Sequence, residues 1–76
     1  ITREEMAKIL CNALELDELE TSANPFDDDA EIAQWAKGYV NAVQAEGIME
    51  GSNGSFNPRD NATRAEGAAV LVRAFA

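Results

Sequence analysis

The chain has 76 residues, of which 14 are acidic and 6 are basic, so its formal net charge is −8 at neutral pH. This length corresponds to one small domain, and an apolar content of 46% is typical of a chain that folds. The negative charge argues against a nucleic-acid partner, and no apolar run approaches the ~20 residues that membrane insertion requires.

The first predicted element is a helix from Arg3 to Leu16. Its apolar residues recur at helical spacing and define one face: Met6, Ile9, Leu10, Ala13 and Leu14. Thr2 and Glu5 at its start match a capping box, in which each side chain accepts a hydrogen bond from the other residue's backbone amide. Cys11 is the single cysteine, so no disulfide forms within the chain, and we interpret it as a small buried apolar residue.

An acidic segment over residues 17–25 comes next, and we interpret it as a linker with a turn at Asn24-Pro25. A second helix is predicted from Asp29 to Glu46, because its apolar residues keep helical spacing: Ile32, Trp35, Ala36, Tyr39, Val40 and Val43. Gly47 is placed to end this helix in the left-handed conformation.

Three consecutive aspartates, Asp27, Asp28 and Asp29, stand at the start of the second helix. Asp28 and Glu31 have the spacing of another capping box. A calcium site is the alternative, but the run lacks the alternating oxygen ligands, central glycine and terminal glutamate of an EF-hand loop. Capping is therefore the favoured interpretation, and no metal or cofactor is predicted.

A polar segment over residues 47–62 separates the second helix from the third. Asn53-Gly54 predicts a turn with a short β-bridge, while Ile48 and Phe56 are expected to reach the core and hold the segment in a defined shape.

The third helix is predicted from Arg64 to Ala76, with Thr63 and Glu66 as its capping box. Its inward residues are expected to be Val70, Leu71, Ala74 and Phe75. The sequence therefore predicts an all-α fold of three helices with a structured loop before the last one.

The tetrad Thr-Arg-x-Glu occurs at residues 2–5 and again at residues 63–66, an offset of 61 positions. Over the 14 paired positions that start there, six residues are identical. Recurrence of one helical element within a short chain is the signature of a repeat array.

Five short motifs carry a family resemblance. In chain order they are Phe26-Asp27-Asp28, Trp35-Ala36, Gly47-Ile48-Met49-Glu50-Gly51, Asn53-Gly54-Ser55-Phe56-Asn57-Pro58 and Thr63-Arg64-Ala65-Glu66. Each motif is weak alone, but their combined order and spacing resemble the S-layer homology (SLH) domain. The resemblance implies that residues 26–76 form a complete SLH repeat, that residues 1–16 are the closing helix of a partial repeat, and that residues 17–25 link them.

The resemblance also implies a function. SLH domains are non-catalytic modules of secreted proteins that attach them to the bacterial cell wall or S-layer. The implied partner is a secondary cell-wall polymer or peptidoglycan-linked glycan, often carrying pyruvylated N-acetylmannosamine. This ligand lies in a groove between repeats with the tetrad arginine, which points to Arg64 and, in the partial repeat, to Arg3. Neighbouring SLH repeats or a homo-oligomer would complete such a groove.

The chemistry of the tetrad supports an anion site. An arginine in the first turn of a helix is electrostatically disfavoured, because the helix dipole places partial positive charge there. A guanidinium beside free helix-start amides suits the carboxylate of a pyruvate ketal. The alternative is that each arginine is exposed and pairs with a local acid such as Asp60 or Glu4. Glu4 also departs from the SLH pattern, which favours alanine there, and adds negative charge beside Arg3.

Three more residues are candidates for ligand contact. Trp35 either packs in the core or stacks on a sugar ring. Gly51 either meets a backbone requirement or lets a ligand approach the main chain. Arg59 precedes the tetrad and could add positive charge to the groove.

The chain has no histidine and one cysteine, so it offers no Ser-His or Cys-His pair and no zinc ligand set. It is therefore predicted not to be an enzyme. The alternative to glycan anchoring is a protein–protein assembly module that self-associates through its helices.

Overall fold

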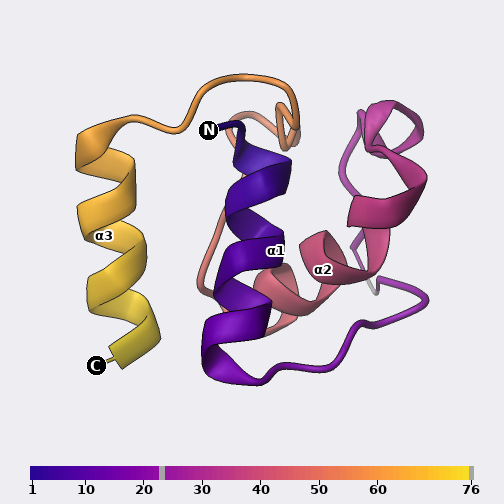
Figure 1. The fold of residues 1–76 in the computed structure, drawn as a ribbon. Coiled ribbons are helices and arrows are strands. Elements are labelled where there is room, and N and C mark those ends of the chain that lie inside the picture. Colours follow the sequence, from indigo (N-terminus) through magenta and orange to yellow (C-terminus); the bar gives the residue numbers. More distant parts are fainter. Residues whose placement is uncertain (23, 76) are drawn as a thin grey trace.

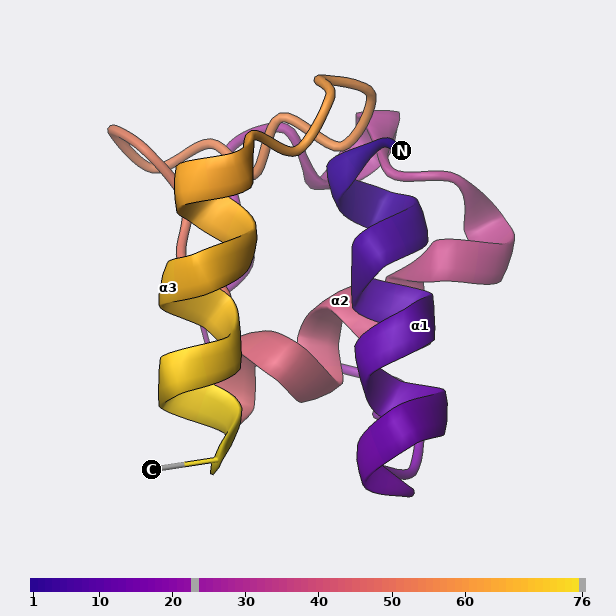
Figure 2. The ribbon, with the colours of Figure 1, turned by 60° about the vertical axis from the view of Figure 1, so that its left-hand side comes forward.

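The computed structural model describes residues 1–22 and 24–75 of the chain. Its regular structure consists of α1 (Arg3–Leu14), a 3-10 turn η1 (Asp29–Glu31), α2 (Gln34–Ala45) and α3 (Arg64–Phe75). α1 and α3 run side by side in the same direction, and α2 crosses α1 (Figure 1 and Figure 2). The predicted all-α fold is confirmed. Ala23 of the predicted linker and Ala76 of the predicted third helix lie outside the described residues.

Capping hydrogen bonds and backbone angles of nearby residues set the ends of α1 and the start of α3. Glu5 donates its amide to the Thr2 hydroxyl (3.3 Å), and Thr2 donates its amide to the Glu5 carboxylate (2.9 Å). Thr63 and Glu66 make the same pair of bonds at the start of α3. α1 ends two residues earlier than predicted, because Glu15 adopts the left-handed conformation with φ 57°. None of the described helices is long and apolar enough to cross a bilayer.

The predicted start of the second helix, at Asp29, is wrong. Residues 29–31 form a single 3-10 turn, the chain is extended at Ile32 and Ala33, and α2 begins at Gln34. Asp28 makes no cap, because the amides of Phe56 and Asn57 occupy its two carboxylate oxygens at 2.9 Å each. The carboxylate therefore holds the polar loop over residues 47–62 in place and does not cap the helix.

Glu4 supplies the cap that α2 lacks. Ala33, the residue before α2, makes no capping bond with its own side chain. Its amide donates instead to Oε1 of Glu4 at 3.1 Å, and Glu4 is buried. The helix dipole favours a carboxylate at this end of α2. The residue expected to add charge beside Arg3 thus serves to join α1 to α2.

Replacing Glu4 by alanine is expected to lower the free energy of unfolding by about 1–2 kcal/mol, because the start of α2 loses its cap. Glu4→Gln keeps an acceptor oxygen and is expected to cost less. Urea unfolding followed by circular dichroism measures both. An alanine variant as stable as the parent would contradict the assigned capping role.

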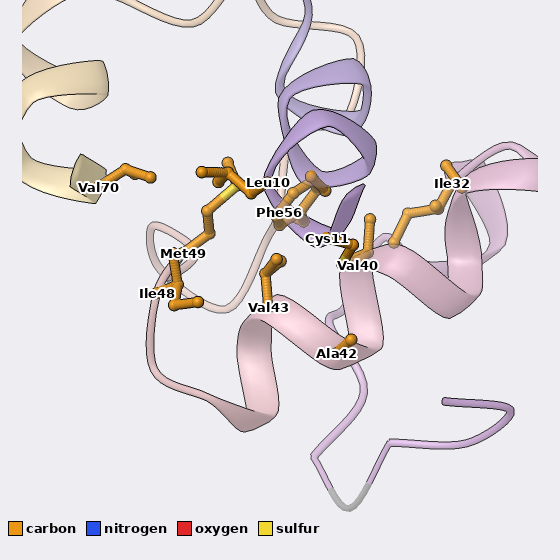
Figure 3. Packing of buried hydrophobic residues seen from close by; sticks show 12 residues of the cluster. Leu10, Cys11, Ile32, Val40, Ala42, Val43, Ile48, Met49, Phe56 and Val70 are labelled. Carbon is orange, nitrogen blue, oxygen red and sulfur yellow. The ribbon is translucent and has the colours of Figure 1, made fainter. Parts of the chain in front are cut away.

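The core lies between α1, α2 and the loop that follows α2, with one contribution from α3 (Figure 3). Its buried apolar residues are Ala7, Leu10, Cys11, Ile32, Ala36, Val40, Ala42, Val43, Ile48, Met49, Phe56 and Val70. Ile48 and Phe56 reach the core as predicted. Val70 points from α3 toward the rest of the cluster.

Several residues of the predicted apolar faces are not buried. Ile9, Ala13, Trp35, Leu71 and Phe75 are exposed. The helical periodicity places these residues on apolar stripes, but the stripes are wider than the surface that neighbouring elements cover in the described chain. The predicted inward orientation is therefore wrong for Leu71 and Phe75, and the exposure of Trp35 excludes the core alternative for that residue.

Cys11 is buried, as predicted, and its thiol donates to the carbonyl of Tyr39 at 3.6 Å. Burial raises the pKa of this thiol, and the negative charge of Glu18 adds to the shift. We expect slow alkylation by iodoacetamide at about pH 8 in the native chain and fast alkylation in urea, because the thiolate is the reactive form. Mass spectrometry of quenched samples measures both rates, and equal rates would contradict the burial.

The raised pKa of Cys11 also makes the free energy of unfolding depend on pH. The unfolded chain releases the Cys11 proton at a lower pH than the native chain does. The stability that this thiol contributes is therefore present below the ordinary cysteine pKa of about 8.5 and is lost as the pH rises through the native value. Cys11→Ala should flatten this alkaline decline.

The polar loop takes a defined path. Asn53 and Gly54 have consecutive positive φ angles of 53° and 85°, and Ser52 and Ser55 pair on either side of them. This is the predicted hairpin turn. Gly47 has a φ of 69° and follows α2, as predicted.

Candidate functional site

The candidate site is a surface groove of about 270 Å³ where the starts of α1 and α3 meet the polar loop. It is lined by Arg3, Glu50, Gly51, Ser52, Asn57, Asp60, Asn61, Thr63 and Glu66. The groove thus joins the first copy of the tetrad, the second copy and the loop between them.

The loop is held across the start of α1 by backbone hydrogen bonds. The amides of Arg3 and Glu4 donate to the carbonyls of Asp60 (2.9 Å) and Pro58 (3.0 Å), and the amide of Ala62 donates to the carbonyl of Ile1 (2.8 Å). The expectation of free helix-start amides is therefore wrong for α1, because the loop carbonyls already use them. Any anion site at Arg3 depends on its side chain.

The Arg3 side chain contacts both the loop and α3. Its Nε donates to the carbonyl of Phe56 at 2.6 Å, and its Nη2 donates to the carbonyl of Glu50 at 2.7 Å. Its Nη1 pairs with the carboxylate of Glu66, and the guanidinium lies 4.8 Å from the centre of the Phe56 ring. One residue thereby connects the three parts of the groove, and 12% of its side chain remains exposed.

Electrostatics around Arg3 act in two directions. Burial lowers the pKa of Arg3, while the negative charges of Asp60 and Asp28 raise it. Glu66 supplies the direct counter-charge and still caps α3 through its other carboxylate oxygen. The groove therefore holds one cation among several acids.

Gly51 lines the same groove, and no larger residue fits at this position. A Cβ at this position would lie 2.5 Å from the carbonyl of Ser55 and 2.6 Å from the ring of Phe26. Phe26 in turn packs on Phe56, with ring centres 5.2 Å apart. The backbone requirement is thus sufficient to explain Gly51, whose main chain still borders the groove.

The other three candidates lie outside the groove. Arg64 is exposed at the start of α3 and Arg59 is exposed on the loop, and neither forms an ion pair with the rest of the described chain. Trp35 is 48% exposed on α2, where the ammonium of Lys8 lies 5.7 Å from its ring centre. The structure therefore brings Arg3 and Gly51 together and separates them from Arg64, Arg59 and Trp35.

Sequence reasoning missed two residues that shape the site. Asp28 holds Phe56 and Asn57 in place, and Glu66 pairs with Arg3 besides capping its own helix. The capping pattern accounted for both residues locally, so no signal pointed to their distant partners. Within the described residues, no cluster of three or more histidine, cysteine, aspartate or glutamate side chains is arranged to hold a metal.

Comparison with known proteins identifies the family. The model of the S-layer homology domain matches residues 25–68, which is more than half of the chain. This range covers the loop, α2 and the second tetrad.

Three curated relatives match nearly all of the chain. An amylopullulanase of Thermoanaerobacterium thermosulfurigenes is 42% identical over 76 residues, which cover 93% of this chain and 4% of that protein. Exoglucanase XynX of Acetivibrio thermocellus is 41% identical over 93% of this chain and 7% of that protein. The surface-layer 125 kDa protein of Lysinibacillus sphaericus is 42% identical over 96% of this chain and 6% of that protein.

The chain thus spans less than a tenth of the length of each relative. The shared part is the SLH segment, which occurs in proteins named as enzymes and in a surface-layer protein. The family match and these identities give one conclusion: the chain belongs to the S-layer homology domain family.

Proposed function

We propose that this chain binds an anionic secondary cell-wall polysaccharide in the groove around Arg3 and so holds a secreted protein on the bacterial cell wall. The family is one of cell-surface anchoring modules, and one relative is a surface-layer protein. The pyruvylated ligand and the contact residues are the parts that we propose.

The position of Arg3 is the observation that carries the proposal. Two loop carbonyls and the Phe56 ring hold its guanidinium, so a ligand would meet a cation that is already oriented. A guanidinium has five N–H donors, and the Phe56, Glu50 and Glu66 contacts use three of them. Two donors remain for a carboxylate, and Ser52, Asn57 and Asn61 offer polar groups to sugar hydroxyls.

Glu66 acts as an internal competitor in this scheme. Its carboxylate neutralises part of the positive charge that would attract a pyruvate carboxylate to the two remaining N–H donors. Removal of its charge should therefore strengthen the binding of an anionic ligand.

The remaining candidates extend the proposal. Arg64 holds the same position in the second tetrad as Arg3 in the first, and we propose it for an equivalent groove completed by a neighbouring repeat. Trp35 and Arg59 are proposed as outlying contacts, with Trp35 as a platform for a sugar ring.

Co-sedimentation with purified Gram-positive cell-wall sacculi, before and after removal of their secondary polymers, tests the function. We expect binding to intact sacculi and its loss after polymer removal. Equal binding to both preparations would exclude the polymer as the ligand, and no binding to either would overturn the proposal for this chain.

Two groove variants test the site in the same assay. Glu66→Gln keeps the capping geometry, since glutamine also serves at this position of a capping box, and should bind several-fold more tightly. Arg3→Lys keeps a charge but loses the planar fork, and it should bind at least about tenfold more weakly. Circular dichroism checks that both variants are folded. If both folded variants bind like the parent, the groove is not the glycan site.

The exposed apolar residues Leu71, Val72 and Phe75 of α3 favour a second candidate, assembly with other protein chains. Light scattering over a range of protein concentrations tests self-association. A mass that rises with concentration in a chain without glycan affinity would favour assembly over anchoring.

A further inference from the structure

Asn53 is the one asparagine of this chain that is followed by glycine. Asparagine is thermolabile, because the backbone nitrogen of the next residue can attack its side-chain carbonyl carbon. Glycine hinders this attack least, because it has no Cβ and changes backbone conformation freely. Of the other asparagines, two precede proline, whose nitrogen carries no hydrogen, and three precede alanine: Asn24 and Asn57, and then Asn12, Asn41 and Asn61.

The structure leaves both reacting groups of this pair accessible. Asn53 and Gly54 are exposed, and among the described residues neither the Asn53 side chain nor the Gly54 amide forms a hydrogen bond. Two hydrogen bonds between Ser52 and Ser55, of 2.8 and 3.0 Å, close the turn as an isolated bridge. Few contacts oppose the opening of such a bridge, so the pair can reach the geometry of attack.

This turn supports the residues that orient Arg3. The carbonyl of Gly54 accepts from the amide of Asp27 at 2.7 Å. The next residue, Asp28, holds the amide of Phe56 at 2.9 Å, and the carbonyl of Phe56 accepts from Nε of Arg3. A change in the turn is therefore connected to the groove through consecutive hydrogen bonds.

We infer that Asn53 is a site of spontaneous modification, and that its modification loosens the Arg3 groove as the protein ages. The amide nitrogen of Gly54 gives up its proton and bonds to Cγ of Asn53, the bond between Cγ and Nδ2 breaks, and ammonia leaves. Water then opens the succinimide ring. Cleavage between the nitrogen and Cγ leaves aspartate, whereas cleavage between the nitrogen and the backbone carbonyl carbon leaves isoaspartate.

Both products change the turn. Isoaspartate adds a methylene group to the main chain between Ser52 and Ser55, so their two hydrogen bonds no longer fit together. Either product adds negative charge to a turn where the carboxylate of Asp27 already lies against Gly54. Both effects weaken the loop that orients Arg3. The modification itself is independent of any ligand, while its effect on binding rests on the proposed function.

Ageing of the purified chain at mildly alkaline pH tests the modification, because the deprotonated amide is the nucleophile. Peptide mass spectrometry follows each asparagine, and a methyltransferase specific for isoaspartate identifies that product. We expect Asn53 to react at least about tenfold faster than any other asparagine of the chain. Asn61 is the internal control, since it is also exposed but precedes alanine. A rate at Asn53 no higher than at Asn61 would overturn the inference.

Asn53→Gly is the matched control for the effect on the groove, because glycine accepts the φ of 53° and has no side-chain amide to lose. The aged parent should unfold at a lower urea concentration and bind sacculi more weakly, and the aged Asn53→Gly chain should keep both properties. Asn53→Asp carries the charge without the extra methylene group, so it should lose less than parent chains that contain isoaspartate.

Two results would overturn the effect on the groove: an unchanged urea midpoint in a fully modified parent, or equal losses in the aged parent and the aged Asn53→Gly chain. A fresh parent chain that does not bind sacculi would contradict the proposed function instead. The rate of modification and the urea midpoint would still decide the inference about Asn53.

Discussion

Replacing Arg3 by alanine is expected to lower the free energy of unfolding by about 2–4 kcal/mol, because one side chain connects α1, the loop and α3. The change leaves the carbonyls of Glu50 and Phe56 without their donor and the carboxylate of Glu66 without its cation. A domain of this size is stable by only about 4–11 kcal/mol, so the loss is a large fraction of the whole. Urea unfolding followed by circular dichroism measures it.

The matched control is Arg64→Ala, which removes the same residue of the same tetrad from the start of α3. Arg64 is exposed, and a change there is expected to stay within about 0.5 kcal/mol in this chain. Arg3→Lys should recover only part of the lost stability, because an ammonium cannot reproduce the planar set of contacts. Equal costs for Arg3→Ala and Arg64→Ala would show that the contacts of Arg3 do not stabilise the fold.

Replacing Asp28 by alanine is expected to lower the free energy of unfolding by about 2–3 kcal/mol. Its carboxylate accepts from the amides of Phe56 and Asn57, and Phe56 is fully buried, so water cannot fully replace the lost acceptor. The loop should then loosen around Phe56. Urea unfolding gives the size of the effect, and hydrogen exchange at these two amides locates it.

Two further variants define the role of Asp28. Asp28→Asn keeps one acceptor oxygen and should lose less stability than Asp28→Ala. Asp27→Asn, at the neighbouring exposed position, should change stability by less than about 0.5 kcal/mol. Faster exchange throughout the chain in Asp28→Ala, without a larger effect at Phe56 and Asn57, would argue against a local clamp.

Asp28 and Arg3 both hold the same loop residue, Phe56. Asp28 fixes the amide of Phe56, and Arg3 binds the carbonyl of the same residue. The Phe56 ring lies in the core and also supports the guanidinium of Arg3. Loop shape, core packing and the oriented cation of the groove therefore depend on one another, and loss of the Asp28 contacts should weaken the proposed glycan binding as well as stability.

Features that depend on residues close together in the chain follow from the sequence alone. The capping residues Thr2 and Thr63, the turn at Asn53-Gly54 and the left-handed Gly47 are all as expected. Each follows from bonds or backbone angles within a few positions of the chain. Burial of Ile48 and Phe56 was also predictable, because large apolar side chains within a polar loop gain free energy by leaving water for the core.

Contacts between groups far apart in the chain are visible in the folded structure and not in the sequence. Asp28 reaches amides 28 and 29 positions away, Glu4 reaches an amide 29 positions away, and Arg3 reaches carbonyls 47 and 53 positions away. Local patterns assign the two acids to other roles, because capping spacing and charge carry no information about distant backbone groups.

The buried faces of α1 and α3 show most clearly what local sequence patterns do not predict. Leu10 and Leu71 are the same residue at the same place in a related helix, and one is buried while the other is exposed. Amphipathic periodicity states that a helix has an apolar face, but burial depends on which elements pack against it. Those elements are the loop and α2, which the path of the whole chain brings to α1 and not to the matching face of α3.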